Sequence, residues 1–564
     1  MARPGRSPCR GPAACRARAP PCASSRARWP ASRYRNGVGS QSAHHKLDVA
    51  ILGGGLAGSF LARQLRRTVP ELRIGLFEKS TERSYKVGES TVEIASSYLT
   101  RRLGLSRYLY HEHLPKNGLR YFFDGPGCDA ALPEMSEVGT ANLPFHPAFQ
   151  IDRARMEADL LADNAEAGVE VRIGARVKAV SLGQDGAHHR FEVIEKGRKT
   201  AHEARWLVDA TGRTSLLAKL KGLRAPESEH CLGAAWGRFE HVADVDEMGP
   251  PQWRERVRYT ARGLSTLHFC YPGYWIWVIP LRNGLTSVGV TGAKEIVDSA
   301  VRSEAGLRAF LERHRAVGSL LREAKLVDFG GYTQIAYGTR QFFDAARWAV
   351  VGEAAAAQDP LYSPGIDFIA LENDFVTDLI RREVAGESEA DRAERTALYD
   401  RFMLFRHEAT MRLYRGLYGV LGSYEIMRMK WDLDVGSYYN MWVAAYMQDM
   451  HLDATFLEQQ LSWQPFLLQG LTNFARLFRN VEAHLKERGT FQRANRGRFS
   501  SGLENIDFVE EVGLPRTRRK MLKKAGELFN VVRQRALDLL EVSPEARLRA
   551  PLALSAFLSD RPLA

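Results

Sequence analysis

The stretch Leu47–Glu78, LDVAILGGGLAGSFLARQLRRTVPELRIGLFE, is the most informative part of this chain about its fold. It opens with the apolar run Val49–Leu52, which is typical of a strand buried on both faces. Three glycines follow in the pattern G-x-G-x-x-G, at Gly53, Gly55 and Gly58. In such a turn the first glycine allows a tight bend, the second lets backbone N–H groups approach a pyrophosphate, and the third lets the next helix pack against the strand.

A second strand candidate ends in an acid at the spacing that a dinucleotide site needs. The segment Leu72–Phe77 is apolar, and Glu78 follows it, twenty residues after Gly58. A carboxylate at this place accepts hydrogen bonds from a ribose hydroxyl. A glycine triplet alone can be an ordinary turn, but strand, triplet, helix, strand and acid together predict a Rossmann-type unit. The stretch leaves open which dinucleotide is bound and for what reaction.

The composition is that of an ordinary globular protein. The chain has 564 residues, of which 45% are hydrophobic and 26% charged, enough for two to four domains. Its net charge of +13 is unevenly placed, because residues 1–46 hold nine arginines and Lys46 without any acid, a charge of +10 that leaves +3 for the rest. The nearly neutral body gives no reason to expect a nucleic-acid partner.

Residues 1–46 are rich in Arg, Pro and Ala and are predicted to be a disordered basic leader. They lack the apolar core of a secretory signal. A transit peptide is one alternative, although six prolines would break its amphipathic helix. We prefer the interpretation that the segment extends upstream of the true start, with the protein beginning near Lys46.

The cysteines predict neither a metal site nor disulfides. Three of the six lie in the leader, and Cys128, Cys231 and Cys270 are scattered without a C-x-x-C spacing. No run of 18 apolar residues occurs, so no membrane span is expected. A reducing cytoplasm fits this usage of cysteine.

Several turns rich in small residues follow the first unit. Val87-Gly88-Glu89-Ser90-Thr91 precedes a predicted helix, for which Ser90 or Thr91 could simply be the N-cap. Lys116 is the only lysine between Lys86 and Lys178, although an isolated lysine beside a turn is usually just solvated.

Two later segments resemble the first unit, because each has an apolar strand that runs into a turn of small residues. Asp152 is a plausible cap for a helix that starts at Arg153, and a β-meander over 169–208 ends in Asp209-Ala210-Thr211-Gly212. A buried strand ends in Gly352-Glu353, and the turn Asp359–Gly365 then precedes a helix over Ile366–Arg381. The start of that helix is a second anion site.

Residues 223–334 and the residues from about 386 onward differ from the first unit in their predicted secondary structure. Residues 223–334 are mostly β, and in the run Gly273–Pro280 the strand period places Trp275 and Trp277 on one face, where they either form a rigid wall or fill a core. From about residue 386 onward the pattern is helical, and the Trp-, Tyr- and Met-rich stretch 431–447 could line an apolar pocket.

Taken in order, the glycine turn, Glu78, Asp209–Gly212 and Gly352–Pro360 resemble the FAD-dependent monooxygenase superfamily over residues 47–385. Within it, V-G-E-[AS]-T and W-x-W-x-I-P are together typical of the flavin-dependent halogenases, and this chain has both, the second at Trp275–Pro280. The resemblance implies an α/β fold with three parts: a Rossmann-type FAD-binding core over 47–385, an interleaved mixed β-sheet substrate subdomain at about 223–334, and an all-helical C-terminal region over 386–564.

The resemblance also implies a set of cofactor contacts. Glu353 stands where the superfamily has Asp, which lengthens its reach by one methylene and weakens the case for a direct contact. The residues assigned to FAD are Gly53, Gly55, Ala57, Gly58, Glu78, Glu89, Ser90, Arg153, Val177, Asp209, Gly212, Gly352, Glu353, Asp359 and Ile366.

In this family reduced FAD and O₂ convert chloride or bromide to hypohalous acid, which reaches a lysine and halogenates an electron-rich ring. By resemblance Lys116 is that lysine, and Pro364 and Gly365 hold the halide, with Gly365 carrying more of the binding because proline has no N–H. Trp275 and Trp277 keep the substrate apart from the flavin. No second G-x-G-x-x-G unit follows residue 78, so a separate flavin reductase is the expected partner.

One departure bears on the substrate. Tyr362 stands where the tryptophan-halogenating branch has Glu, so a phenolic, pyrrolic or carrier-protein-bound aromatic is expected rather than free tryptophan. Two alternatives remain open from the sequence. One is a single-component FAD-dependent hydroxylase or epoxidase, and the other is a non-enzymatic flavin-binding scaffold.

Overall fold

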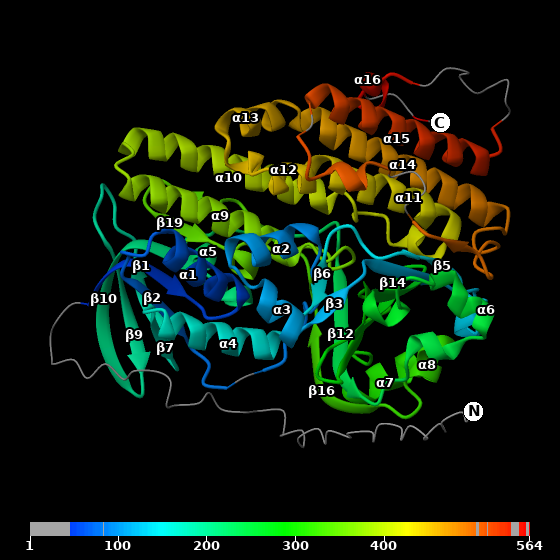
Figure 1. The fold of residues 1–564 in the computed structure, drawn as a ribbon, viewed down its shortest axis with the longest axis horizontal. Coiled ribbons are helices and arrows are strands. Elements are labelled where there is room, and N and C mark those ends of the chain that lie inside the picture. Colours follow the sequence, from blue (N-terminus) through cyan, green and yellow to red (C-terminus); the bar gives the residue numbers. More distant parts are fainter. Residues whose placement is uncertain are drawn as a thin grey trace, which may run out of the picture.

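The computed structural model describes residues 45–82, 84–502, 507–515, 517–542, 552–559 and 563. The predicted leader thus falls almost wholly outside the described residues. The described chain forms two eight-stranded sheets and a layer of helices that extends along one side of both (Figure 1). The predicted α/β fold with a helical C-terminal region is confirmed.

The first sheet contains the predicted Rossmann-type unit. Its central strand β1 pairs in parallel with β2 on one side and β10 on the other, and Val49–Leu52 is fully buried. The order is β18-β19-β10-β1-β2-β7, with β9 and β8 as an antiparallel extension of β10. The strands are β1 (His45–Leu52), β2 (Ile74–Glu78), β7 (Glu170–Ile173), β8 (Arg176–Ser181), β9 (His189–Glu195), β10 (Arg198–Asp209), β18 (Phe343–Asp344) and β19 (Trp348–Val350).

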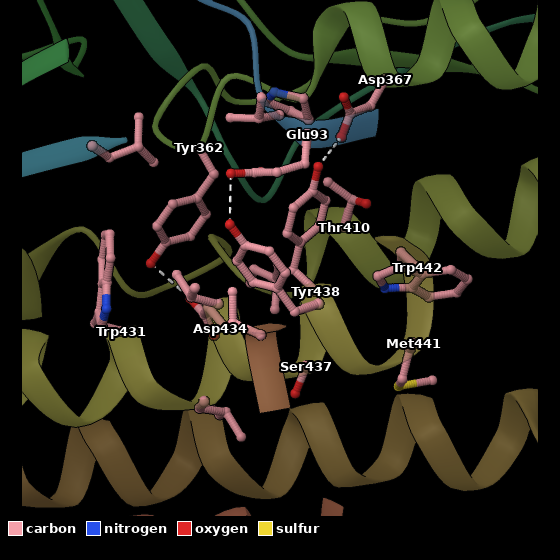
Figure 2. Close-up of a pocket in the computed structure, with 18 of the residues that line it drawn as sticks. Glu93, Tyr362, Asp367, Thr410, Trp431, Asp434, Ser437, Tyr438, Met441 and Trp442 are labelled. Atoms are coloured by element: carbon pink, nitrogen blue, oxygen red, sulfur yellow. Dashed lines mark hydrogen bonds between the residues drawn. The ribbon is translucent and has the colours of Figure 1, made fainter. Parts of the chain in front are cut away.

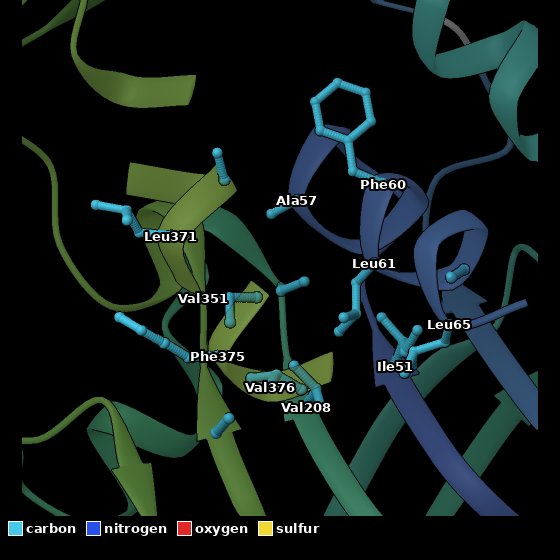
Figure 3. Packing of buried hydrophobic residues seen from close by; sticks show 14 of the residues in the cluster. Ile51, Ala57, Phe60, Leu61, Leu65, Val208, Val351, Leu371, Phe375 and Val376 are labelled. Atoms are coloured by element: carbon cyan, nitrogen blue, oxygen red, sulfur yellow. The ribbon is translucent and has the colours of Figure 1, made fainter. Parts of the chain in front are cut away.

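Helices α1 (Leu56–Thr68), α4 (Arg153–Glu166) and α9 (Gly365–Val384) pack on this sheet. Leu61 and Leu65 of α1 lie against Ile51, and Phe375 of α9 continues the same core (Figure 3). Each such buried side chain contributes roughly 1.5–3 kcal/mol. The predicted cap is confirmed, because the Asp152 side chain accepts a hydrogen bond from the Arg155 N–H at 3.1 Å.

The second sheet is mixed and contains the predicted β region. Its order is β16-β12-β15-β14-β13-β4-β5-β20, so it also takes strands from before and after residues 223–334. The strands are β4 (Leu119–Phe123), β5 (Ser136–Val138), β12 (Leu232–Glu240), β13 (Thr266–Tyr271), β14 (Tyr274–Pro280), β15 (Thr286–Ala293), β16 (Lys325–Tyr332) and β20 (Phe499–Ser500). Two-stranded pairs join β3 (Leu114–Lys116) to β6 (Ala148–Gln150), and β11 (Arg224–Pro226) to β17 (Tyr337–Thr339).

The helical layer contains α10 (Glu389–Met411), α11 (Tyr424–Ser437), α12 (Ala444–Met447), α13 (Ala454–Ser462), α14 (Gln464–Glu487), α15 (Arg518–Leu539) and α16 (Leu554–Phe557). A π-helical turn, η10 (Tyr438–Val443), joins α11 to α12. The other helices are α2 (Glu93–Ser97), which continues into the π-turn η2 (Tyr98–Arg102), α3 (Ser106–Glu112), α5 (Leu216–Leu220), α6 (Pro251–Arg254), α7 (Glu304–Glu312) and α8 (Arg315–Leu320). Among the described residues no helix combines the length and apolarity that crossing a bilayer requires.

Candidate active site

A cavity of about 920 Å³, called here the large cavity, opens at the carboxyl ends of the parallel strands. Gly53 follows β1, Glu78 ends β2, Gly212 follows β10, and Gly352 follows β19. In a doubly wound sheet this edge is where ligands bind. The topology therefore brings residues 53, 78, 212 and 352 to one wall.

Most of the residues predicted to contact a cofactor line this cavity. Gly58 and Asp209 are the exceptions, because they lie behind the residues that line the cavity. The Asp209 carboxylate accepts hydrogen bonds from the N–H groups of Thr211 at 2.9 Å and Leu217 at 2.6 Å, which holds the turn after β10 in place. The predicted residues on the wall are Gly53, Gly55, Ala57, Glu78, Glu89, Ser90, Arg153, Val177, Trp275, Trp277, Gly212, Gly352, Glu353, Asp359, Pro364, Gly365 and Ile366.

The glycine turn fits the pyrophosphate of a dinucleotide. Gly53 has φ +113°, and a Cβ added there would lie 2.2 Å from the Ala210 carbonyl oxygen. At Gly58 an added Cβ would lie 2.0 Å from the Gly53 oxygen, so only glycine lets α1 come this close. Gly55 caps α1 without any side-chain hydrogen bond, which leaves the first N–H groups of the helix available to an anion.

Glu78 is held at the end of β2 by the backbone. Its Oε2 accepts the N–H of Gly54 at 2.7 Å, and its Oε1 accepts that of Ser80 at 2.7 Å. Each carboxylate oxygen has a second lone pair, which suits a ribose hydroxyl. Glu353 is about half exposed, and its carboxylate lies 3.7 Å from Arg213 Nη1. These donors and acceptors fit FAD.

The V-G-E-S-T turn is fixed by a buried ion pair. Arg238 on β12 lies 2.8 Å from the Glu89 carboxylate, and both side chains are 1% exposed. Asp328 on β16 holds the same guanidinium at 3.3 Å. A pair this deeply buried is costly to break, because one charge would then remain without compensation. The second sheet thereby sets the position of this part of the cavity wall.

Asp359 connects the large cavity to the helical layer. Its carboxylate accepts a hydrogen bond from the Tyr418 hydroxyl at 2.6 Å and lies 2.6 Å from Nε2 of His230. The Tyr418 oxygen in turn accepts the indole N–H of Trp275 at 3.0 Å. Trp275, Trp277 and Ile279 all line the cavity, as the strand period predicted for one face. Neither His230 nor Tyr418 lies in a recognisable motif, so neither was predicted.

The turn before α9 has the geometry of an anion site. Ser363 adopts φ +55°, and the helix starts at Gly365. An added Cβ at Gly365 would meet nothing within 4 Å, so this position faces open space. The first N–H groups of a helix of 20 residues have no intrahelical partner, and the helix dipole favours negative charge there.

A second cavity of about 160 Å³, called here the aromatic cavity, lies between the V-G-E-S-T helix and the helical layer (Figure 2). The stretch 431–447 contributes Trp431, Tyr438, Tyr439 and Trp442 to its lining, as its composition suggested. Strand β3 places Lys116 in the same wall.

Lys116 is 1% exposed and donates to Ser90 Oγ at 2.7 Å and to the Thr91 carbonyl at 2.6 Å. Burial lowers the pKa of Lys116 to about 7, although the negative charges of Glu93 and Asp367 act in the opposite direction. The ammonium form has three donors, and the third has no partner among the described residues.

The two cavities meet at the turn before α9. Pro364 lines both of them. Ser90, on the wall of the large cavity, accepts from Lys116 on one side and lies 2.9 Å from Ser363 Oγ on the other. One serine therefore separates the buried lysine from the predicted halide turn.

Three carboxylates around the aromatic cavity escaped sequence analysis. Glu93 accepts from the Tyr439 hydroxyl at 2.6 Å, Asp367 from Tyr438 at 2.8 Å, and Asp434 from Tyr362 at 2.8 Å. Burial raises the pKa of Asp367 to about 7. Acids in the first turn of a helix are common, so the positions of Glu93 and Asp367 carried no distinctive signal.

Comparisons with known proteins agree with this geometry. A family model described as an FAD binding domain matches residues 46–295. The flavin-dependent halogenase chlA of Dictyostelium discoideum is 27% identical over 440 residues, 72% of each chain. A 1H-pyrrole-2-carbonyl-[peptidyl-carrier protein] chlorinase of Pseudomonas fluorescens is 24% identical over 57% of this chain and 73% of its own.

Among solved structures, halogenase PltM superposes with a TM-score of 0.63 at 18% identity, over 91% of this chain and 99% of its own, which establishes the shared fold. The family model, the curated relatives and the shared fold point the same way. The chain therefore contains an FAD binding domain and is similar to flavin-dependent halogenases over 72% of its length, with the fold of a solved halogenase.

Proposed function

We propose that this enzyme uses reduced FAD, O₂ and chloride or bromide to halogenate an electron-rich aromatic ring held in the aromatic cavity. When bound, reduced FAD with O₂ supplies the oxidising power that turns halide into hypohalous acid. The observation that carries the proposal is the junction of the two cavities, where Pro364 lines both and Ser90 connects Lys116 with Ser363.

In this proposal the halide binds at the turn before α9. Pro364 has no N–H to offer, so Gly365 and the next N–H groups of the helix hold the anion. Trp275 and Trp277 form the wall of the large cavity that keeps the substrate away from the flavin, and their indole N–H groups are bonded to Tyr418 and Ser287.

Lys116 takes the role of the group that activates the oxidant. Its third N–H donates a hydrogen bond to the oxygen of hypohalous acid, which makes the halogen more electrophilic. Lys116 is buried, and the local dielectric constant there is lower than in water, so this hydrogen bond is stronger there than in solution.

The aromatic cavity favours a small hydrophobic substrate. A volume of about 160 Å³ suits one aromatic ring, because an engineered cavity of about 150 Å³ holds benzene. Tyr362, where the tryptophan-halogenating branch has Glu, is bound to Asp434 and offers no free carboxylate to Lys116. We propose a phenol or pyrrole, free or bound to a carrier protein, and a separate flavin reductase as the electron source.

The proposal is tested by incubating the purified protein with FAD, a flavin reductase, NADH, bromide or chloride, and a panel of phenols and pyrroles. Halogenated products that require both halide and reductase are expected. Oxygenated products under saturating halide would contradict the proposal, as would substrate-stimulated NAD(P)H oxidation by the protein without a reductase. The second result would favour the single-component monooxygenase.

A further inference from the structure

The three tyrosine–carboxylate pairs of the aromatic cavity are not equivalent. Asp367 is 1% exposed, and each of its oxygens accepts a hydrogen bond, from the Ala95 N–H at 2.8 Å and from the Tyr438 hydroxyl. Asp434 is paired with Lys430 and Tyr362. Both partners of Asp434 bind its Oδ2, while its Oδ1 is buried without a hydrogen-bond partner among the described residues.

Glu93 differs from both. It lines the cavity without being fully buried, and only its Oε1 accepts a hydrogen bond, from the Tyr439 hydroxyl. Its Oε2 has no partner among the described residues. Figure 2 shows the Glu93 side chain extending into the space between Tyr362 and Tyr438. Among these three acids, Glu93 therefore has the carboxylate oxygen that is unpaired and not fully enclosed by the protein.

A carboxylate facing aromatic rings is costly unless a ligand or a nearby cation compensates it. Glu93 has both an acceptor position turned to the cavity and an electrostatic attraction to Lys116, which lines the same space. The other charged groups in the cavity lining are Lys116, Arg406, Asp367 and Asp434. The phenolic hydroxyls there are those of Tyr362, Tyr414, Tyr438 and Tyr439. This pair of opposite charges across a one-ring cavity suits a substrate with an acidic hydroxyl.

We propose that Glu93 binds the ring hydroxyl of a phenolic substrate and accepts its proton. The inference rests on the proposed function, which it deepens by naming the part of the substrate that is recognised and the base that activates it. Tyr439 already donates a phenolic hydrogen bond to this carboxylate, so the group accepts such a donor in its present geometry.

The proton balance closes within the site. The phenol O–H breaks and its proton goes to Glu93, while the ring carbon takes the halogen from hypohalous acid and the O–X bond breaks. The leaving hydroxide takes a proton from Lys116 and becomes water. The halogenated dienone then loses its ring proton to the Lys116 amine and recovers the hydroxyl proton from Glu93. The sum is one aromatic C–H and one hypohalous acid converted to one C–X bond and water.

The experiment uses 4-nitrophenol, whose phenolate has its own absorption band. The FAD-loaded, oxidised enzyme is mixed with it in the absence of halide and reductase, at a pH well below the pKa of the free phenol. A bound phenolate band is expected with the wild type, and a band at least about tenfold weaker with Glu93→Gln. Absence of the band in the wild type would overturn the inference.

Two variants separate this role from a structural one. Asp367→Asn changes the other carboxylate that acts on Lys116 and should keep the phenolate band. Tyr439→Phe removes the one hydrogen-bond donor that Glu93 has among the described residues, and it should also keep the band. If Glu93 only anchors Tyr439, then Tyr439→Phe and Glu93→Gln will lose the band equally, and the inference fails. Should Glu93→Gln not fold, as judged by FAD retention, Glu93→Ser takes its place.

Turnover distinguishes failure of the inference from failure of the proposed function. The wild type should prefer a phenol over its methyl ether, and Glu93→Gln should lose most of that preference. A wild type that ionises 4-nitrophenol but halogenates no aromatic would contradict only the proposed function. A wild type that halogenates phenols, with a Glu93→Gln variant that keeps the full preference, would contradict only the inference.

Discussion

The large cavity and the aromatic cavity are built in opposite ways. The first is shaped by backbone turns at the ends of parallel strands, where Gly53, Gly212 and Gly352 hold conformations with positive φ. The second is shaped by side chains from β3, α9, α11, η10 and α14, which are far apart in the sequence. A site made by backbone geometry can therefore be predicted from a local motif, whereas a site made by packed side chains depends on tertiary structure.

The strongest disruption of the backbone-built site is Gly53→Ala. Its Cβ would collide with the Ala210 carbonyl oxygen, at a φ that alanine avoids. We therefore expect the free energy of unfolding to fall by about 3–5 kcal/mol and the protein to lose its ability to bind FAD. Chemical denaturation of the FAD-free protein measures this. Gly55→Ala is the matched control, because its Cβ would meet only Glu157 Oε1 at 3.9 Å. It should keep the stability of the FAD-free protein and weaken only FAD binding; equal stability losses in both variants would refute the distinction.

In the side-chain-built site, Lys116→Met should have the largest effect on chemistry. Removing the donor to hypohalous acid is expected to lower kcat for halogenation by about 10²–10⁴-fold while FAD remains bound. Product formation is measured by mass spectrometry, and flavin content by absorbance. Lys325→Met, at an exposed position of β16, serves as the control. Retention of full halogenation without Lys116 would remove it from the mechanism.

The pH dependence of the halogenation rate also tests the role of Lys116, with a smaller expected effect that is reversible. Because burial lowers the pKa of Lys116 to about 7, the ammonium is present below that pH and is lost as the pH rises above it. We therefore expect the halogenation rate to fall above about pH 7. Asp367 titrates in the same range, so the profile of Asp367→Asn shows which group is responsible. A rate that stays flat from pH 6 to 9 would mean that the charge of Lys116 is not needed.

Ser90→Ala tests the link between the cavities and should have the smallest effect. The change removes one of two acceptors of Lys116 and the partner of Ser363. A net loss of about 0.5–1.5 kcal/mol for one hydrogen bond corresponds to a decrease in kcat of up to about tenfold. We also expect more hypohalous acid to escape into solution, which a soluble trap detects. An unchanged ratio of escaped oxidant to halogenated product would show that the link does not guide the oxidant.

The fold was predictable where local patterns determine it. Residues close together in the sequence determine four of the predicted features, and the structure has each of them at nearly the predicted residues. They are the apolar run of β1, the glycine turn, the Asp152 cap and the strands around Trp275. Strand β20 was not predicted, because only two residues, Phe499 and Ser500, pair with β5 within an otherwise helical region.

The residues of the large cavity and Lys116 were predictable, but the acids around the aromatic cavity were not. The family resemblance selected Lys116, which the structure places in a cavity wall beside Ser90. The acids around it could not be found in this way, since Glu93 and its partner Tyr439 are 346 positions apart. The pairing exists only because the helical layer folds back over the first half of the chain (Figure 1).

The π-helical turn Tyr438–Val443 has a consequence for the origin of this cavity. An α-helix turns by about 100° per residue, so two neighbouring side chains normally diverge. The wider turn contains one extra residue and lets Tyr438 and Tyr439 both reach acids of the same cavity, Asp367 and Glu93. Losing that one residue would restore a regular helix from Tyr424 to Met447 and turn one of the two tyrosines away. The polar lining of the cavity thus depends on the register of a single helical turn.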